Sequence, residues 1–335
     1  MKYCKGSKGI LAAALAITPC FANAALDLDA CLLDALRNAD NTVTVAEIRA
    51  SCEDDDASAA TVDTVQRPVY ERSVIAERFD EERELERRPF VITPHNPNYF
   101  TASYFDDPNQ APFEEATGIS DAIEDSEVNF QISIKAPLWR NVFGSNIDAY
   151  FAYTARSWWQ LSNDDVSSPF RETNYQPEFF FRSFTQRDFL GLTLAGWSLG
   201  FVHESNGRAD PLSRSWNRIM ARFGVEASPD LTFLVRAWHR IEEDEEDDDN
   251  RHMHRYYGNG DIRAIWTPNR NTITAMLRPG TDHTSYELTW SYPISPVFRV
   301  YAQYYNGYGE SLLDYDYDNE RIGVGIALND YLMRR

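Results

Sequence analysis

A histidine, a serine and an asparagine lie close together in the sequence and have the side chains that an acyl-transfer site needs. They are His203, Ser205 and Asn217. A serine hydroxyl is a weak nucleophile until a neighbouring base takes its proton, and His203 is close enough in sequence to be that base. The asparagine oxygen can accept a hydrogen bond from the other ring nitrogen and so fix the tautomer of the imidazole. Because asparagine carries no charge, we expect another group to help stabilise the developing oxyanion.

The residues around these three alternate between apolar and polar, which places all three on one face of two paired strands. His203 and Ser205 continue the parity of the apolar residue Phe201. On the next predicted strand, Asn217 has the parity of Ile219. If this apolar face meets lipid, polar side chains on it are costly unless they have a role. The alternative is that His203 and Ser205 are rim residues that hydrogen-bond only to headgroups and water.

The same alternation recurs along the chain from residue 97. In 128–135, four apolar residues alternate with four polar ones, as in a strand with one apolar and one polar face. Twelve such strands are predicted, at 97–105, 127–136, 147–160, 173–185, 190–204, 213–225, 231–241, 253–267, 270–278, 283–293, 297–307 and 319–330. Short turns are predicted at 187–188, 227–230, 269–271 and 295–296, and long loops at 161–172, 206–212, 242–252 and 307–318. This pattern predicts an all-β fold, a twelve-stranded antiparallel transmembrane β-barrel.

A soluble β-sandwich or barrel would show the same alternation, so other features must decide between them. Aromatic residues gather near the ends of predicted strands, for example Trp158, Trp159 and Trp290. They are typical of membrane interfaces. No run of about 18 apolar residues follows the N-terminal segment, so no membrane-spanning helix is predicted. Together with a predicted export signal, these features favour the membrane barrel.

Residues 1–24 have the layout of a secretory signal peptide. Three lysines precede the apolar run 10–21, which is too short to span a membrane as a helix, and Ala22-Asn23-Ala24 is a small-x-small cleavage site. We expect cleavage after Ala24. The signal directs the mature chain into an oxidising compartment, where a disulfide between Cys31 and Cys52 is favoured over two free thiols.

An acidic N-terminal extension, residues 25–90, precedes the barrel at 91–335. Residues 26–40 form a short amphipathic pattern that predicts a helix, and 53–88 is charged enough to be a linker or a loose helix. The whole chain has a formal charge of −20. This acidity excludes nucleic acid as the expected partner, because a phosphate backbone requires clustered lysine and arginine.

The stretch that contains His203, Ser205 and Asn217 closely resembles the active-site stretch of the outer membrane phospholipase A family. It reads His-Glu-Ser-Asn-Gly-Arg-Ala-Asp-Pro-Leu-Ser-Arg-Ser-Trp-Asn-Arg over 203–218. The resemblance extends to Ser-Trp-Trp-Gln-Leu-Ser-Asn at 157–163, Ser-Ser-Pro-Phe-Arg-Glu-Thr-Asn-Tyr at 167–175 and Gly-Tyr-Gly-Glu-Ser-Leu at 307–312. It covers about residues 97–331. The Gly-x-Ser-x-Gly nucleophile elbow of other lipases is absent.

The resemblance implies a phospholipase with A1 and A2 activity in the bacterial outer membrane. It would hydrolyse the sn-1 and sn-2 acyl esters of glycerophospholipids and lysophospholipids. The resemblance assigns Ser205 as nucleophile, His203 as base and Asn217 as the residue that orients the base. It assigns the amide of Gly207 to the oxyanion. The active site would face the outer leaflet, where it would meet phospholipid only when lipid asymmetry fails.

The resemblance also implies a calcium ion and a calcium-dependent homodimer. The Arg208 carbonyl and the Ser213 hydroxyl would bind the ion, and Ser167 would contribute from the partner subunit. Calcium prefers oxygen ligands and polarises carbonyl groups as a Lewis acid. It would therefore supply the positive charge that an asparagine-containing triad lacks.

Three positions depart from the family pattern. Ala155 stands where the family has a glutamine on the dimer face, and the chain ends beyond Tyr331 rather than at the phenylalanine usual for barrel assembly. The loop 242–249 is a run of eight acids, in which Asp249 is a weaker match to a calcium-binding aspartate of the family. The alternative, which we favour, is a solvated loop that attracts cations.

A porin or structural barrel without lipolytic activity is the alternative from another functional class. The residues predicted to face the lumen include Tyr150, Trp216, Arg218 and Arg321. Their size and charge favour a filled lumen over an open channel.

Overall fold

A computed structural model describes residues 72–88, 90–164, 167–244, 246 and 248–334 of the chain. The signal peptide 1–24, the predicted helix 26–40 and the Cys31–Cys52 pair lie outside the described residues. The described residues all belong to one compact unit.

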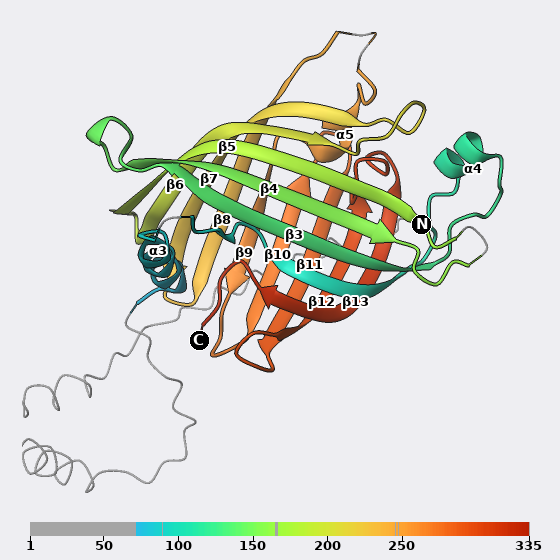
Figure 1. Cartoon of the computed structure of the whole chain (residues 1–335). Helices are drawn as coiled ribbons and strands as arrows, with labels where there is room; N and C mark the ends of the chain where they lie inside the picture. The colour runs from blue at the N-terminus through green and yellow to red at the C-terminus, as the bar shows by residue number, and fades with distance from the viewer. Residues whose placement is uncertain (1–71, 89, 165–166, 245, 247, 335) are drawn as a thin grey trace, which may run out of the picture. The chain divides into compact units, whose positions relative to one another are not determined.

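Twelve long antiparallel strands form a closed barrel (Figure 1). They are β2 (Asn98–Phe105), β3 (Ser126–Trp139), β4 (Ile147–Trp159), β5 (Phe170–Phe189), β6 (Leu192–Ser205), β7 (Ser215–Ser228), β8 (Leu231–Ile241), β9 (Gly260–Trp266), β10 (Thr272–Pro279), β11 (Thr284–Pro293), β12 (Arg299–Tyr308) and β13 (Asp318–Asn329). Each strand pairs with its neighbour in sequence, and the first strand, β2, pairs with the last, β13. A two-residue strand, β1 (Thr93–Pro94), adds to β3. The predicted twelve-stranded barrel is confirmed.

Two details of the strand prediction are wrong. Residues 253–259 do not continue a strand, because Met253–Tyr257 is a short helix, α5, and β9 begins only at Gly260. Met253 and Tyr257 are four residues apart and are both buried, a helical rather than an alternating period. The turn predicted at 187–188 lies instead at Leu190-Gly191, where both residues have positive φ. Such a two-residue turn matches the twist of a tight hairpin.

The outside of the barrel is apolar and the inside is polar. Exposed apolar residues include Phe201 of β6, Ile219 of β7, Leu288 of β11 and Val324 of β13, whereas Arg321 on the opposite face of β13 is 0% exposed. A soluble barrel would have the reverse arrangement, with a dry interior and a polar exterior. The inverted pattern is that of a barrel whose outer face contacts lipid.

Short helices precede the barrel strands or lie in the connections between them. Besides α5, they are α3 (Val74–Leu85), α4 (Ala111–Thr117) and the single turn η2 (Val142–Gly144). Within the described ranges no helix is long and apolar enough to cross a membrane.

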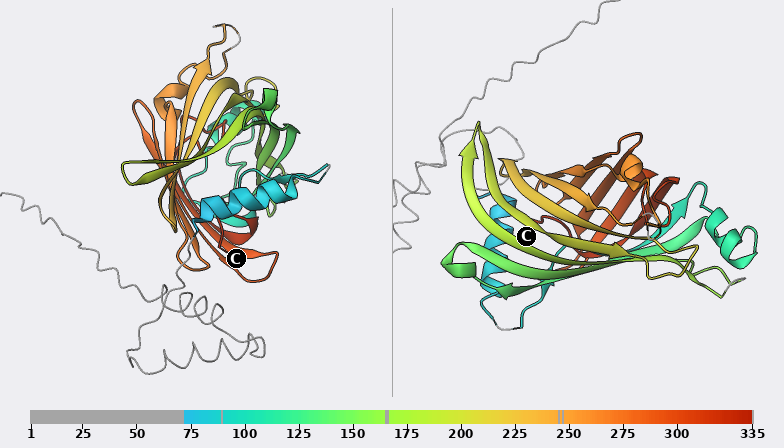
Figure 2. Two further views of the ribbon diagram at one scale, coloured as in Figure 1. Left: turned by 90° about the vertical axis from the view of Figure 1, so that its left-hand side faces the viewer. Right: turned by 90° about the horizontal axis from the view of Figure 1, so that it is seen from above.

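Helix α3 lies across one end of the barrel (Figure 2). Its first amide, of Val74, donates to the carbonyl of Pro229 in the short turn between β7 and β8. Ser73 caps the helix, accepting from the amide of Ala76 at 3.3 Å. We call this the short-turn end of the barrel and the opposite end the long-loop end. Part of the segment expected to be a linker or a loose helix is thus a regular helix packed on the barrel.

Buried ion pairs hold α3 in place. Glu82 accepts from Lys135 of β3 at 2.7 Å and from Arg182 of β5 at 2.8 Å. Burial opposes ionisation of Glu82, but the positive charges of Lys135, Arg78 and Arg182 outweigh it and hold the pKa of this carboxyl well below its usual value. The carboxylate therefore stays charged and keeps the helix attached.

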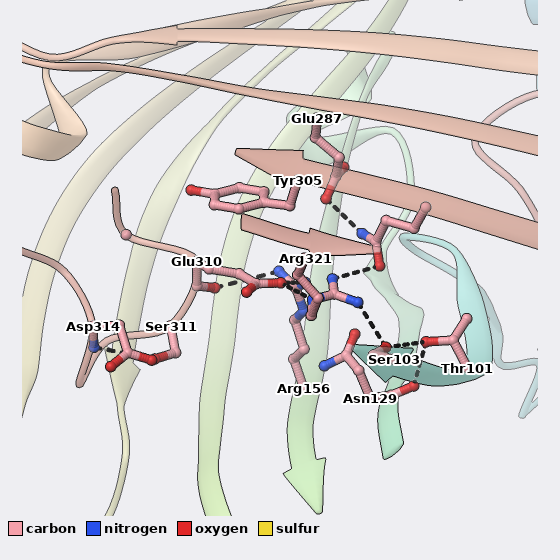
Figure 3. A network of polar contacts seen from close by, with 12 residues as sticks. Thr101, Ser103, Asn129, Arg156, Glu287, Tyr305, Glu310, Ser311, Asp314 and Arg321 are labelled. Carbon is pink, nitrogen blue, oxygen red and sulfur yellow. Dashed lines mark hydrogen bonds and ion pairs between the residues drawn. The ribbon is translucent and has the colours of Figure 1, made fainter. Parts of the chain in front are cut away.

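Charged side chains fill the interior of the barrel (Figure 3). Arg321 of β13 pairs with Glu310 and donates to Ser103 at 2.9 Å and to Gln303 at 2.8 Å. Arg156 reaches the same Glu310 from β4 at 3.1 Å. Further pairs join Arg171 to Glu127 and Asp314, Arg222 to Glu178, and Arg236 to Asp261. A lumen packed in this way is unsuited to passive diffusion, which argues against the porin alternative.

We expect Arg321→Met to destabilise the barrel by about 3–5 kcal/mol, because it removes one partner of a buried carboxylate. The midpoint of urea unfolding in lipid or detergent, followed by circular dichroism, measures the change. The triple variant Arg321→Met, Glu310→Gln, Arg156→Met should recover part of the loss, since no unpaired charge then remains on Glu310 or Arg156. Equal stability of Arg321→Met and wild type would show that the network contributes little.

Candidate active site

The register of the β6–β7 hairpin brings the predicted site residues together at the long-loop end. His203 pairs directly with Asn217, and Ser205 pairs with Ser215. Side chains of directly opposite residues on an antiparallel pair lie about 4.5–5.5 Å apart at Cβ, so the histidine and the asparagine can meet. Both strands show their odd-numbered residues on the outside, as the exposure of Phe201 shows for β6. The structure thus places His203, Ser205 and Asn217 on the outer face.

A hydrogen bond of 2.9 Å joins Nδ1 of His203 to Oδ1 of Asn217. An amide oxygen can only accept, so Nδ1 carries the proton in this arrangement. The other ring nitrogen, Nε2, is then unprotonated and available as a base. The asparagine therefore selects the tautomer that a general base requires.

Ser205 lies two residues beyond His203 on the same face of β6. Residues two apart on a strand are separated by about 6.6 Å along it and point to the same side of the sheet. The two side chains are therefore neighbours on the outer face. In the part of the chain that the structure describes, the two side chains are not hydrogen-bonded to each other. Catalytic hydrogen bonds are often long without substrate and tighten in the complex.

Asn206 braces the loop that follows the serine. Its side chain is 5% exposed, and its Oδ1 accepts from the amides of Arg208 at 3.2 Å and Arg214 at 3.0 Å. Its Nδ2 donates to the carbonyl of Leu212 at 2.7 Å. One buried side chain thus ties both arms of the loop together, and the main chain next to Ser205 is held in a defined conformation.

Gly207 directly follows Asn206 in this braced loop. Its φ is +66°, in the left-handed region that favours glycine, and a Cβ would lie 3.4 Å from the ring of Tyr175. Among the described residues its amide has no acceptor. An amide that is rigidly held and unpaired beside the serine has the properties of an oxyanion donor.

The side chain of Arg208 anchors the loop to β5. It donates to the carbonyls of Phe170 at 2.8 Å and Arg171 at 2.7 Å, and its Nε lies 3.4 Å from the buried carboxylate of Glu172. The arginine head is thereby engaged in structure, which leaves only its backbone carbonyl for a ligand role.

Ser213 and Asp249, two of the predicted calcium ligands, are in contact. The hydroxyl of Ser213 donates to Oδ2 of Asp249 at 2.8 Å, and the amide of Ser215 donates to Oδ1 at 3.1 Å. The loop after β8 therefore folds back onto the loop after β6. A hydroxyl beside a carboxylate is an oxygen-only donor set, which fits the preference of calcium.

Ser167 is not part of this cluster within its own barrel. It is exposed in the turn before β5, and its amide donates to the carbonyl of Asp164 at 3.3 Å. In the described structure it makes no hydrogen bond to Arg208 or Ser213. The contribution of Ser167 to a calcium site therefore stays a prediction.

A groove of about 400 Å³ adjoins the site on the outer face of β3 to β6. It is lined by Phe130, Ala155, Ser157, Phe170, Thr173, Tyr175, Asn206 and Arg208. The aromatic residues make one part of the groove apolar, and Asn206 and Arg208 mark the part next to Gly207. Its dimensions and lining suit an acyl chain whose ester lies near Ser205.

Two residues of the site were not identified from the sequence. Asn206 is part of the quoted motif, but only the structure shows that it braces the loop. Glu243 accepts from Nδ2 of Asn217 at 2.9 Å. Nothing in the run of acids distinguishes Glu243 from its neighbours, so no sequence signal could have found it.

Known proteins resemble this chain over most of its length. The family model described as Phospholipase A1 matches residues 75–328. Phospholipase A1 of Escherichia coli (strain K12) is 38% identical over 277 residues, which cover 82% of this chain and 93% of that protein.

Two solved structures share the fold. One is the outer membrane phospholipase A of Escherichia coli in the form of an asparagine-to-alanine active-site mutant, with a TM-score of 0.70 and 36% identity over 77% of this chain and 98% of that chain. The other is the Salmonella typhi outer membrane phospholipase dimer with bound calcium, with a TM-score of 0.70 and 37% identity over 77% and 98% of the two chains. The chain therefore belongs to the phospholipase A1 family and is a phospholipase of the bacterial outer membrane.

Proposed function

We propose that the protein hydrolyses both the sn-1 and the sn-2 acyl esters of glycerophospholipids, and the remaining ester of lysophospholipids, through Ser205, His203 and Asn217. The observation that carries the proposal is the hydrogen bond between His203 and Asn217 on the lipid-facing surface, with Ser205 two residues beyond His203 on β6. The related Escherichia coli protein, whose active-site mutant replaces an asparagine, supports an active role for an asparagine.

The chemistry has two halves that return the site to its starting state. Nε2 of His203 takes the proton of the Ser205 hydroxyl as Oγ attacks the ester carbonyl, and the resulting imidazolium gives that proton to the departing glycerol oxygen. A water molecule then loses a proton to His203 and attacks the acyl-serine. The fatty acid leaves as the proton returns to Ser205. Asn217 holds the ring in the required tautomer throughout.

The developing oxyanion needs donors that are already in place. The amide of Gly207 is held by the braced loop beside Ser205 and supplies one. The Arg208 carbonyl, the Ser213 hydroxyl and the Asp249 carboxylate would hold calcium, with Ser167 contributed by a partner subunit. A bound calcium ion would supply Lewis-acid stabilisation of the ester carbonyl and of the oxyanion that develops there.

A homodimer is part of the same proposal. Among the described residues Ser167 makes no hydrogen bond to Arg208 or Ser213 of its own barrel, so a second subunit would provide it. A second barrel would also cover the open side of the groove, whose floor includes Ala155. The small alanine leaves this contact without the polar side chain that the family pattern has there. The site lies at the long-loop end, which corresponds to the outer leaflet in barrels of this kind.

Hydrolysis of a phosphatidylethanolamine with different acyl chains at sn-1 and sn-2 tests the positional claim. In calcium-containing mixed micelles we expect both fatty acids to be released, because the groove is open and accepts a chain from either ester. Mass spectrometry of the products measures their ratio. Release of one fatty acid, with a single lysophospholipid accumulating, would reject activity at the second position. Stepwise ion conductance in planar bilayers without lipolysis would instead support a passive barrel.

A further inference from the structure

The carboxylate of Glu243 stands directly behind the catalytic asparagine. Its Oε1 accepts from Nδ2 of Asn217 at 2.9 Å, while Oδ1 of the same amide accepts from Nδ1 of His203 at 2.9 Å. Glu243 is half-buried, whereas its neighbours Glu242 and Asp244 are exposed. Glu243 is thus turned towards Asn217, whereas its immediate neighbours face solvent.

This contact fixes which atom of the Asn217 amide faces His203. A side-chain amide can rotate by 180° and offer its NH2 group in place of its oxygen. With the NH2 group towards the imidazole, Nδ1 would have to accept, and Nε2 would carry the proton and could not act as a base. An ionised carboxylate only accepts, so Glu243 stabilises the orientation in which Nδ2 faces Glu243 and Oδ1 faces His203.

The carboxylate also brings charge to a triad that lacks it. A hydrogen bond to an ionised acceptor is stronger than a neutral one, and it polarises the amide so that Oδ1 becomes a better acceptor. The imidazolium that forms when His203 takes the serine proton is then stabilised through Asn217. Through Asn217, Glu243 therefore supplies the negative charge that an aspartate next to the histidine supplies directly in other triads.

The loop that carries Glu243 is held to the barrel beyond this contact. Arg240 at the end of β8 donates to the carboxylate of Asp248 at 2.6 Å and to the carbonyl of Asn250 at 2.9 Å. Asp249 is bonded to Ser213 and to the amide of Ser215. These bonds hold the far end of the loop, and Glu243 follows the end of β8 at Ile241 by only two residues.

We propose that Glu243 is a positioning residue. It is the fourth member of an array that begins with Ser205, His203 and Asn217. This inference rests on the proposed function, since it assumes that Asn217 orients the base. Glu243 does not touch the substrate, and it acts only through the amide. Its contribution is therefore made in the transition state and leaves substrate binding unchanged.

The first experiment compares kcat and KM of the full-length protein, refolded in micelles with calcium, for three variants. We expect Glu243→Ala to lower kcat about tenfold with KM unchanged, which is the value of one hydrogen bond to a charged group. Glu243→Gln should lose less, about threefold, because its side-chain oxygen can still accept from Asn217 but carries no charge. Glu242→Ala removes the same charge one residue away and should retain wild-type activity. Circular dichroism confirms that each variant is folded.

The second experiment distinguishes action through Asn217 from a general effect of the loop. In an Asn217→Ala background, Glu243→Ala should cost nothing further, since the group through which it acts is gone. An equal tenfold loss in both backgrounds, or wild-type kcat for Glu243→Ala, would overturn the inference. If instead Ser205→Ala or Asn217→Ala keeps full activity, the proposed function itself fails. Loss in those two variants with no effect of Glu243→Ala rejects only the role of Glu243.

Discussion

Replacing Ser205 with alanine is expected to lower phospholipid hydrolysis by about 10⁴-fold or more. The variant keeps His203, Asn217 and the Gly207 amide but lacks the oxygen that forms the acyl-enzyme. Water would then have to attack the ester directly, without a covalent intermediate. The measurement is the initial rate of fatty-acid release from phosphatidylethanolamine in micelles that contain calcium.

Ser215→Ala is the matched control for this prediction. Ser215 pairs with Ser205 across the β6–β7 hairpin, and only its backbone amide contacts Asp249. Its side chain has no role in the proposed chemistry, so this variant should keep wild-type activity. Hydrolysis that survives Ser205→Ala, or an equal loss in both serine variants, would contradict the assignment of the nucleophile.

Removing calcium is expected to lower hydrolysis by about 10²–10³-fold, the size of effect seen when a stabilising group is taken from a developing oxyanion. Without the ion, the neutral amide of Gly207 would be the proposed donor left to stabilise the oxyanion. A calcium titration after treatment with a chelator measures the dependence. Full activity in the presence of excess chelator would refute a calcium role.

Variants of the proposed ligands sharpen this test. Ser213→Ala and Asp249→Asn should each raise the calcium concentration that gives half-maximal activity, because each removes or weakens an oxygen ligand. Asp244→Asn is the control, since it removes one charge from the same loop at an exposed position. An equal shift for Asp244→Asn and Asp249→Asn would indicate that the loop attracts calcium only through its overall charge.

The barrel could be predicted from the chain because its strands carry their own signal. Each strand alternates, and the alternation also says which residues share a face, so the placement of Phe201, His203 and Ser205 on the outside followed from parity. The prediction failed where local pattern and structure differ. Residues 253–259 contain enough aromatic residues to resemble a strand, but Met253 and Tyr257 are buried at a helical spacing.

Part of the site was also accessible from the sequence. His203, Ser205 and Asn217 lie on adjacent strands of one hairpin, and a hairpin brings residues together that are close along the chain. Asp249 was a weaker match because loop length differs from the family pattern, and its contact with Ser213 appears only in the folded chain. The calcium role of both residues stays a prediction.

Helix α3 shows the same limit at the other end of the barrel. Its residues look like those of a charged linker, because Glu82 and Arg78 resemble solvated side chains. Their partners, Lys135 and the carbonyl groups near Tyr331, are far away in sequence. A local sequence pattern cannot predict an ion pair whose two residues come from distant parts of the chain.

Short-range patterning was thus sufficient for the number of strands, their inward and outward faces and the placement of His203, Ser205 and Asn217 on one face of a hairpin. Long-range contact decided which of the loop acids faces Asn217, how Asn206 holds the oxyanion loop and how the lumen is filled. The physical reason is that alternation and hairpin pairing act between neighbours in sequence. The meeting of the loop after β8 with the loop after β6 depends instead on barrel closure and on which hydrogen bonds the packed loops can satisfy.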